Sequence, residues 1–401
     1  MPVILATDLM VFLLFGLVVY AVVAGRKSEY IRSVWREIRK NRLAVISLVI
    51  LAFYGAVALT DSIRWRDAVV GEDGEVSITA GGDTIYNPLV LSLLDRLLTP
   101  LSTKTEKTFS APLASRQYVK ETIELPDGTK KRSYPELKHP RTHLLGTDKV
   151  GGDVLLSAIK GIRTGVVIGT GATLIMIPFA IFFGVMAGFF GGIVDDIIQY
   201  IYTTLASIPG ILLIVAFMLI FSEKGYQGGL VQDKDLYLGF FVPSDRLFWL
   251  CVILGVTSWT GLCRLIRGET LKLRELEYVQ AARAFGVARL RIIYRHIVPN
   301  VMHLVLITFV LLFSELVLAE AVLSYIGIGV GSEMGSWGNM INAARLELSR
   351  EPVVWWSLVG AFVFMFALVL PANIFGDAVR DALDPRLRTG RGSGPEKSRK
   401  K

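Results

Sequence analysis

Cysteine and histidine are scarce in this chain of 401 residues, which has two of the first and four of the second. Cys251 and Cys263 stand twelve residues apart on one expected helix. About 18 Å of helix axis would separate them, which is beyond the reach of a disulfide, so we expect two buried packing residues. His139 and His143 are four apart with Pro140 between them. We expect ordinary loop histidines there and no metal site.

Two kinds of chemical motif are missing as well. The pattern G-x-x-x-x-G-K-[ST] does not occur, so the chain lacks the phosphate cradle of a nucleotide-binding subunit. No grouping of Ser with His, or of His with Cys and Asp, indicates an enzyme. We therefore expect no catalytic, cofactor-binding or metal-binding residues in this chain.

Long apolar runs are abundant instead. The chain is 52% hydrophobic and 19% charged, with a mean hydropathy of +0.52. Its apolar residues form blocks of roughly 18–25 residues, long enough to cross a bilayer core of about 30 Å. This pattern predicts an all-α polytopic membrane protein. The expected spans are residues 3–24, 43–60, 164–189, 197–221, 247–266, 301–325 and 354–375.

The distribution of basic residues predicts the orientation of these spans. Lys and Arg number seven in 25–42, eight in 264–300 and eight in 377–401, against three in 222–246 and two in 326–353. Because cytoplasmic connections carry an excess of Lys and Arg, the three basic segments are expected inside. The net charge of +8 then reflects topology, and nucleic acid is not an expected partner. In the first block, basic residues follow the apolar stretch, which predicts an uncleaved anchor with its N-terminus outside.

The outward connections differ in character. Residues 61–145 should form a small mixed extracytoplasmic insertion, with hairpins in "VVGEDGEVSI" and "VKETIELPDGTKKRSY". The glycine-rich run "YIGIGVGSEMGSWGNMI" predicts a re-entrant turn followed by a short helix at about 338–348. Within the spans, Gly184 and Gly188 form a small-x-x-x-small face suited to close helix contact.

The segment "EYVQAARAFGVARLRIIYRHIVPN", residues 277–300, is basic and half apolar. Its four arginines would cost about 10–14 kcal/mol inside a membrane, so it should stay outside. An apolar stripe on its first helix ends at Gly286, and Leu290, Ile293 and Ile297 continue an apolar face until Pro299 stops the helix. Such a low ridge fits a groove on another protein, or it rests on lipid as an amphipathic helix.

Several of these motifs carry a family resemblance. "QAARAFGVARLRIIYRHIVP" resembles the EAA loop of ABC importer permeases, which docks on the ATPase subunit. With "HLLGTDKVGGDVLLSAIKGIRTG", "AGFFGGIVDDIIQ", "LSYIGIGV" and "GDAVRDALDPRLR" in order, the chain is similar to the C-type permease subunits of the dipeptide, oligopeptide and nickel importers. Gln280 stands where the loop usually has Glu, which keeps size and hydrogen bonding but loses charge. Gly152 stands where the family usually has Arg.

The resemblance implies an ABC importer permease bundle with six core spans, to which this chain adds one N-terminal span. The implied partners are a second related permease, two ABC ATPase subunits that bind ATP and Mg, an extracytoplasmic substrate-binding protein and membrane lipid. The implied location is the bacterial inner membrane, with the C-terminus in the cytoplasm. Peptides are the expected substrate, while nickel or another small solute uses the same subunit plan.

The expected domain plan and sites follow from these observations. The parts are an extra span (1–25), a basic segment with the first core span (26–60), the insertion (61–145), the permease core (146–375, with coupling loop 275–299) and a basic tail (376–401). For ATPase coupling we single out Tyr278, Gln280, Ala281, Ala282, Arg283, Phe285, Gly286, Arg289, Arg291 and Pro299. Glu315 and Glu320 are carboxylates inside a span, so they either line the path or hydrogen-bond a neighbouring helix. Ser336, Trp337 and Asn339 are candidates for a gate or for contact with the binding protein.

Two other classes of protein compete with this interpretation. A secondary transporter would show coupling-ion carboxylates in two repeated halves, and no internal repeat is visible. A membrane enzyme or scaffold would need a catalytic constellation in its outward part. Co-purification of an ATPase would favour the importer over both.

Overall fold

The computed structural model describes residues 2–3, 5–26, 29–69, 86–124, 130–227, 246–331 and 334–383. Within these residues, five helices are long and apolar enough to cross a membrane. They belong to α3 (Arg42–Ser62), α6 (Val154–Phe190), α9 (Arg246–Leu273), α12 (Val298–Tyr325) and α14 (Trp356–Leu383). A bent pair, α7 (Gly192–Ser207) and α8 (Gly210–Gln227), supplies a sixth, and α1 (Ala6–Gly25) is a further apolar helix. The predicted helical membrane bundle is confirmed.

The expected span at 197–221 folds as two helices that meet at 89°. Ile208 joins them in an extended conformation, with φ of −88° and ψ of 130°. The ring of Pro209 disfavours a helical conformation for the residue before it, and proline has no N–H to continue the ladder.

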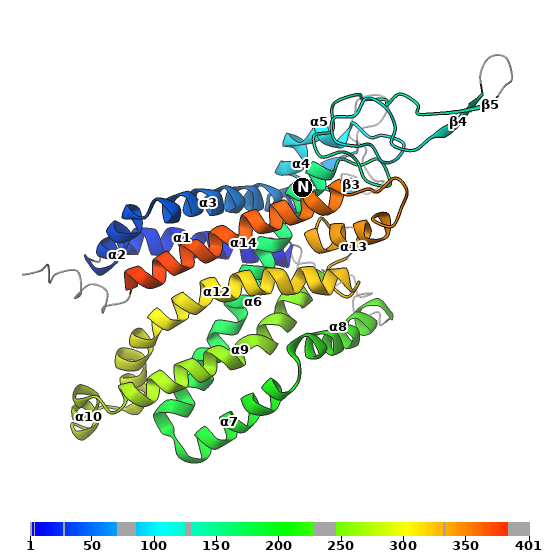
Figure 1. The fold of residues 1–401 in the computed structure, drawn as a ribbon. Coiled ribbons are helices and arrows are strands. Elements are labelled where there is room, and N and C mark those ends of the chain that lie inside the picture. The colour runs from blue at the N-terminus through cyan, green and yellow to red at the C-terminus, as the bar shows by residue number, and fades with distance from the viewer. Residues whose placement is uncertain are drawn as a thin grey trace, which may run out of the picture.

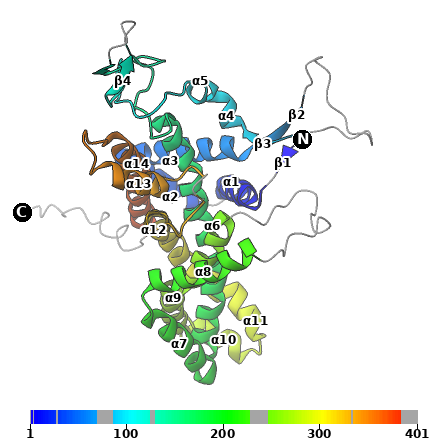
Figure 2. The same cartoon turned by 90° about the vertical axis from the view of Figure 1, so that its right-hand side faces the viewer.

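α6 lies at the centre of the bundle in both views (Figures 1 and 2). Its closest neighbour is α9, and small residues set that distance. A Cβ on Gly184 would lie 2.8 Å from the carbonyl oxygen of Cys263, and one on Gly188 would lie 2.6 Å from Cβ of Thr270. The predicted close contact through these glycines is confirmed. Cys251 and Cys263 are buried free thiols, as expected.

α1 is joined to the bundle by buried polar contacts near its start. Asp8 and Arg163 of α6 are both buried, with 2.5 Å between carboxylate oxygen and guanidinium nitrogen. The same guanidinium donates to the hydroxyl of Thr7 at 2.8 Å and to that of Ser62 at 3.3 Å. Just before α1, strand β1 (Pro2–Val3) pairs antiparallel with β2 (Arg64–Ala68), directly after α3. Both attachments lie at the same end of α1.

The segment between α3 and α6 is mixed, as predicted. β2 pairs antiparallel with β3 (Tyr86–Ser92), and the short helices α4 (Leu93–Leu97) and α5 (Thr99–Ser102) follow. β4 (Glu121–Glu124) pairs with β5 (Lys130–Ser133), which confirms the second expected hairpin. The first expected hairpin, in 69–78, lies almost wholly outside the described residues. The insertion ends at α6, whose N-cap Asp153 also lies 2.9 Å from Nδ1 of the buried His143.

Short helices mark the two ends of the bundle (Figure 1). α2 (Glu29–Lys40) packs Val34 and Ile38 against Ala378 and Ala382 of α14. α10 (Glu277–Ala284) and α11 (Arg289–Ile292) lie at the end of the bundle opposite to β4 and β5. α13 (Trp337–Glu347) confirms the short helix expected after the glycine-rich turn.

Candidate coupling surface and transport path

The loop between α9 and α12 is a helix–turn–helix whose turn depends on Gly286. This residue has φ of +75°, a conformation that costs glycine little and other residues more. The N–H of Val287 donates to the carbonyl of Ala282 at 3.0 Å, and that of Gly286 to the carbonyl of Arg283 at 3.0 Å. This pair of bonds is a Schellman motif, which closes α10 and redirects the chain. The predicted break at Gly286 is confirmed.

One side of this loop is fixed to the bundle. Val279, Ile292 and Ile297 are fully buried in a cluster with residues of α6, α7, α9 and α12. The guanidinium carbon of Arg283 lies 4.6 Å from the centre of the Phe189 ring of α6, a cation–π contact. Leu290 is not part of this contact, and its side chain is 74% exposed.

Pro299 does not end the helix, contrary to expectation. α11 passes through a π-helical turn (Ile293–Ile297) into α12, so that residues 289–325 form one continuous helix. Pro299 lies in the first turn of α12, and the N–H of Val298 donates to the carbonyl of Ile293, five residues back. In a π turn, each N–H bonds to the carbonyl five residues back. The carbonyl that Pro299 cannot serve is then free to accept from the next residue, so the helix continues through the proline. The loop is therefore mechanically continuous with a span.

Other side chains of the loop are apolar and exposed. We define the α10–α11 surface by four exposed side chains: Tyr278 (45%), Phe285 (86%), Leu290 (74%) and Tyr294 (81%). The remaining candidate coupling residues lie around it: Gln280, Ala281, Gly286, Arg289, Arg291 and Pro299 are exposed and Ala282 is half-buried. Gln280 turns its amide back onto the carbonyl of Glu275, at 3.1 Å. Clustered exposed aromatic and aliphatic side chains rimmed by charge are typical of an interaction site.

The two carboxylates of α12 have different surroundings. Glu320 is buried, and its Oε1 accepts hydrogen bonds from the hydroxyls of Ser324 at 2.7 Å and Ser336 at 2.6 Å. This is the hydrogen-bonded alternative that the sequence left open. Glu315 is exposed between the exposed apolar side chains of Leu311 and Leu318, and it has no ion-pair or hydrogen-bond partner among the described residues. Only Glu315 faces outward.

The three gate candidates hold the glycine-rich turn in place. Ser336 caps α13 by accepting from the N–H groups of Gly338 and Asn339. The indole N–H of Trp337 donates to the carbonyl of Ala158 at 2.9 Å, and its ring lies where Cβ atoms on Gly161 and Gly165 of α6 would clash. The amide of Asn339 donates to the carbonyls of Gly331 and Met334. Ser336 and Trp337 are buried, so both are internal ties in this conformation.

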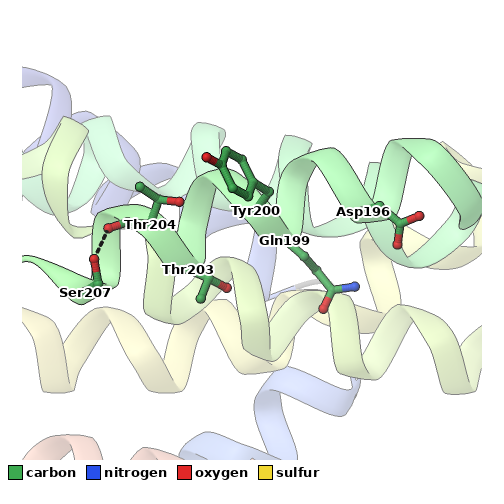
Figure 3. A pocket seen from close by; sticks show the side chains of 6 residues that line it. All are labelled: Asp196, Gln199, Tyr200, Thr203, Thr204 and Ser207. Carbon is green, nitrogen blue, oxygen red and sulfur yellow. Dashed lines mark hydrogen bonds between the residues drawn. The ribbon is translucent and has the colours of Figure 1, made fainter.

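One polar surface was not singled out from the sequence. A shallow, open depression of about 550 Å³ lies along α7 and is lined by Asp196, Gln199, Tyr200, Thr203, Thr204 and Ser207. Figure 3 shows Asp196, Gln199 and Thr203 projecting from the same side of this helix. The signal was present as polar residues at 196, 199, 203 and 207, three to four apart, within a block that we interpreted only as apolar.

Comparison with known proteins agrees with this arrangement. Residues 180–389 match the family described as binding-protein-dependent transport system inner membrane component, and residues 29–63 match the N-terminal TM domain of oligopeptide transport permease C. The oligopeptide transport system permease protein OppC of Bacillus subtilis is 31% identical over 62% of this chain and 73% of its own length. The dipeptide transport system permease protein DppC of the same organism is 30% identical over 61% and 69%.

Two further similarities complete the comparison. OppC of Mycobacterium tuberculosis is 32% identical over 63% of this chain and 79% of its own length. A chain from the inward-facing MetNI methionine ABC transporter aligns with a TM-score of 0.39 at 18% identity, over 56% of this chain and 94% of that one. The latter likeness is too low to add to the assignment. The family match spans more than half of this sequence, and the chain belongs to the binding-protein-dependent transport system inner membrane components, the permease subunits of ABC importers whose ATPase activity lies in separate subunits.

Proposed function

We propose that this permease imports peptides, together with a second permease, two ABC ATPase subunits and an extracytoplasmic binding protein. The relatives named above are oligopeptide and dipeptide permeases, and they support peptides as the substrate. This chain has no phosphate-binding loop, so separate subunits must bind and hydrolyse ATP, as they do in this family.

The α10–α11 surface is the proposed seat of the ATPase, and its exposure is the observation that carries this proposal. Phe285 and Tyr294 are each more than four-fifths exposed, although aromatic side chains of this size ordinarily bury most of their area. Aromatic residues are also those that contribute most at protein interfaces. Arg289 and Arg291, exposed beside them, would pair with acidic or carbonyl groups at the rim of the partner's groove.

Movement of the ATPase would reach the bundle through two rigid connections. Val279, Ile292 and Ile297 fix the loop to the cluster formed by α6, α7 and α9. The continuous helix 289–325 carries the same loop directly into α12. A force on the α10–α11 surface would therefore tilt α12 and not merely deform a loop. In this proposal α10, α2 and the basic tail (376–401) face the cytoplasm, while the insertion (61–145) and the N-terminus face outward.

Glu315 is the proposed contact of this chain with the transport path or with the second permease. A carboxylate in mid-span is expensive in lipid, so an exposed one needs water or protein beside it. Glu320, held by two hydroxyls, is proposed as a structural tie. Ser336, Trp337 and Asn339 are proposed to hold the turn that closes the outward end of the bundle.

Cross-linking and uptake in the assembled transporter test these proposals. Phe285→Cys should cross-link to the ATPase subunit, and Phe285→Asp should abolish peptide uptake while the complex still forms its permease pair. Leu346→Asp, at an equally apolar and 69% exposed position of α13 near the opposite end, is the matched control and should transport normally. Normal uptake by a stable Phe285→Asp transporter would refute the docking role. Uptake of nickel but not of peptides by the wild type would refute the substrate.

A further inference from the structure

The surface of α7 consists of three faces. Ile198 and Tyr202 are buried against the bundle, and Ile193, Ile197 and Ile201 form an exposed apolar face. Between them lies the polar face of α7, which we define as Asp196, Gln199, Thr203 and Ser207 (Figure 3). Asp195 fixes this orientation, because both of its carboxylate oxygens accept from Arg267 of α9, at 2.5 and 2.7 Å.

The polar face does not suit lipid. From Asp196 to Ser207 it runs about 16 Å along the helix axis, which takes it well into a bilayer core. Polar side chains at that depth face a bundle interior or a water-filled cavity. The exposed apolar face on the same helix already supplies a surface for lipid, so the polar face is available to water.

The interruption of the helix between α7 and α8 gives an independent reason to expect water beside α7. Ile208 is extended and 41% exposed, and Pro209 and Gly210 after it are also exposed. Irregular backbone at membrane depth occurs only where protein buries it or where it lines a water-filled cavity. Here the described residues leave it uncovered. The polar face and the break are continuous along one side of α7.

We propose that the polar face of α7 and the break at Ile208–Pro209 line the aqueous path through which the solute crosses the membrane. This inference rests on the proposed peptide import and names residues that touch the solute. The polar face offers the amide of Gln199 and the hydroxyl of Thr203, which both donate and accept hydrogen bonds. The hydroxyl of Ser207 donates to the carbonyl of Thr204 at 2.7 Å and offers its oxygen as an acceptor. Asp196 adds one carboxylate at the end near Gly191. That set fits a short peptide, whose backbone amides meet the neutral groups and whose amino terminus meets the carboxylate.

The neutral groups also fit a transporter that passes many peptide sequences. Hydroxyl and amide side chains bond to backbone groups that all peptides share. Because these side chains are neutral, they form no ion pair with the solute. An ion pair deep in the path would hold one solute too firmly to release it. Selectivity for side chains would then be left to other subunits.

Cysteine labelling in the assembled wild-type complex tests the path directly. Gln199→Cys and Thr203→Cys should react with a hydrophilic thiol reagent severalfold faster than Ile197→Cys and Ile201→Cys, which are matched controls on the apolar face of the same helix. Cys251 and Cys263 are buried, so the unsubstituted protein gives the background. A transported peptide should slow the labelling of the first pair only. Equal rates on the two faces, or disulfide cross-links from Thr203→Cys to the second permease without reagent access, would overturn the proposal.

A transport measurement separates this inference from the proposed function. Thr203→Trp should reduce peptide uptake severalfold, whereas Ile197→Trp should not, and Phe285→Cys should still cross-link to the ATPase in both backgrounds. If the wild type imports peptides and Thr203→Trp does so equally well, the path assigned to α7 is wrong while the proposed function stands. If the wild type imports no peptide, the proposed function fails and this inference fails with it.

Discussion

Glu320 shows how the structure decides between two chemical roles for one residue. Its buried carboxylate accepts from Ser324 and Ser336, and Ser336 in turn caps α13. The residue therefore links α12 to the turn before α13. The sequence placed a carboxylate in a span but could not say what surrounded it, because Ser336 is sixteen residues away.

Glu320→Gln should leave uptake and stability close to those of the wild type, since the amide oxygen can accept from both hydroxyls. Glu320→Ala should lower the free energy of unfolding by about 1–3 kcal/mol, because two buried hydroxyls lose their acceptor. Thermal unfolding in detergent and uptake by the reconstituted transporter measure the two effects. Loss of uptake in a stable Glu320→Gln complex would show that the charge itself is needed and that this residue meets the solute.

Gly188 and Gly268 offer a matched pair on the contacting helices α6 and α9. A Cβ on Gly188 would clash with Thr270, whereas one on Gly268 would meet nothing within 4 Å. Gly188→Ala should therefore destabilise the protein by about 1–3 kcal/mol. Gly268→Ala should be neutral or stabilising by up to about 1 kcal/mol, because alanine favours helix. Effects of equal sign in thermal unfolding would contradict the close approach of the two helices at Gly188.

At the scale of elements, the apolar blocks predicted which segments are helical but not how the helices continue. The block 197–221 contains a right-angled break, and residues 289–325 form one helix across an expected stop. A proline is present at both places. Pro209 follows a residue that becomes extended, whereas Pro299 follows a π turn that tolerates it. The sequence shows a proline in each case, but whether the helix breaks or continues there depends on the packing around it.

α1 should depend on its buried ion pair for attachment. Asp8→Asn leaves the buried Arg163 without its counter-charge, and removing one partner of such a pair costs about 3–5 kcal/mol. The thermal unfolding temperature of the purified chain should fall accordingly. Arg163→Gln combined with Asp8→Asn should recover part of the loss, because no buried charge remains. A double variant as unstable as the sum of the two singles would show that the charges do not interact.

The insertion should be held to α6 by an ion pair that weakens in acid. Asp95 of α4 contacts Lys160 of α6. Burial alone would raise the pKa of this carboxyl, but hydrogen bonds from Lys160 and Ser92 and the charge of Lys160 outweigh it and hold the pKa below its usual value. The folded pKa lies below the unfolded one, so the stabilisation is present above about pH 4 and is lost as pH falls through the lowered value.

Asp95→Asn should accordingly lower the unfolding temperature at neutral pH, and the difference from the wild type should shrink as pH falls below about 4. Asp67→Asn is the control. Its partner Arg96 is 2.6 Å away, but both side chains are about half exposed, and surface pairs contribute little. A difference for Asp95→Asn that stays constant with pH would rule out the titration of this carboxyl as its cause.

At the scale of the whole molecule, the sequence was enough to predict the fold class and the family, but not which side chains are exposed on the surface. The apolar blocks and the ordered motifs predicted a permease bundle, and the family match confirms it. The faces that each helix turns outward could not be predicted, because they depend on contacts between distant segments. The exposure of Leu290 and the orientation of the polar face of α7, which the contact of Asp195 with Arg267 holds, are examples.

The orientation of the bundle gives a final prediction. Val150, in the turn before α6, is 70% exposed, and Phe285 of the α10–α11 surface is 86% exposed near the opposite end. The excess of Lys and Arg in 25–42 and 264–300 favours a cytoplasmic location for the α10 end. In intact spheroplasts a membrane-impermeant maleimide should therefore label Val150→Cys at once, and Phe285→Cys only after permeabilisation. Prior binding of the ATPase should then protect Phe285→Cys alone, since the surface proposed for docking and the insertion would lie on opposite sides of the membrane. Labelling of Phe285→Cys in sealed spheroplasts would place the α10–α11 surface outside, where no ATPase could reach it.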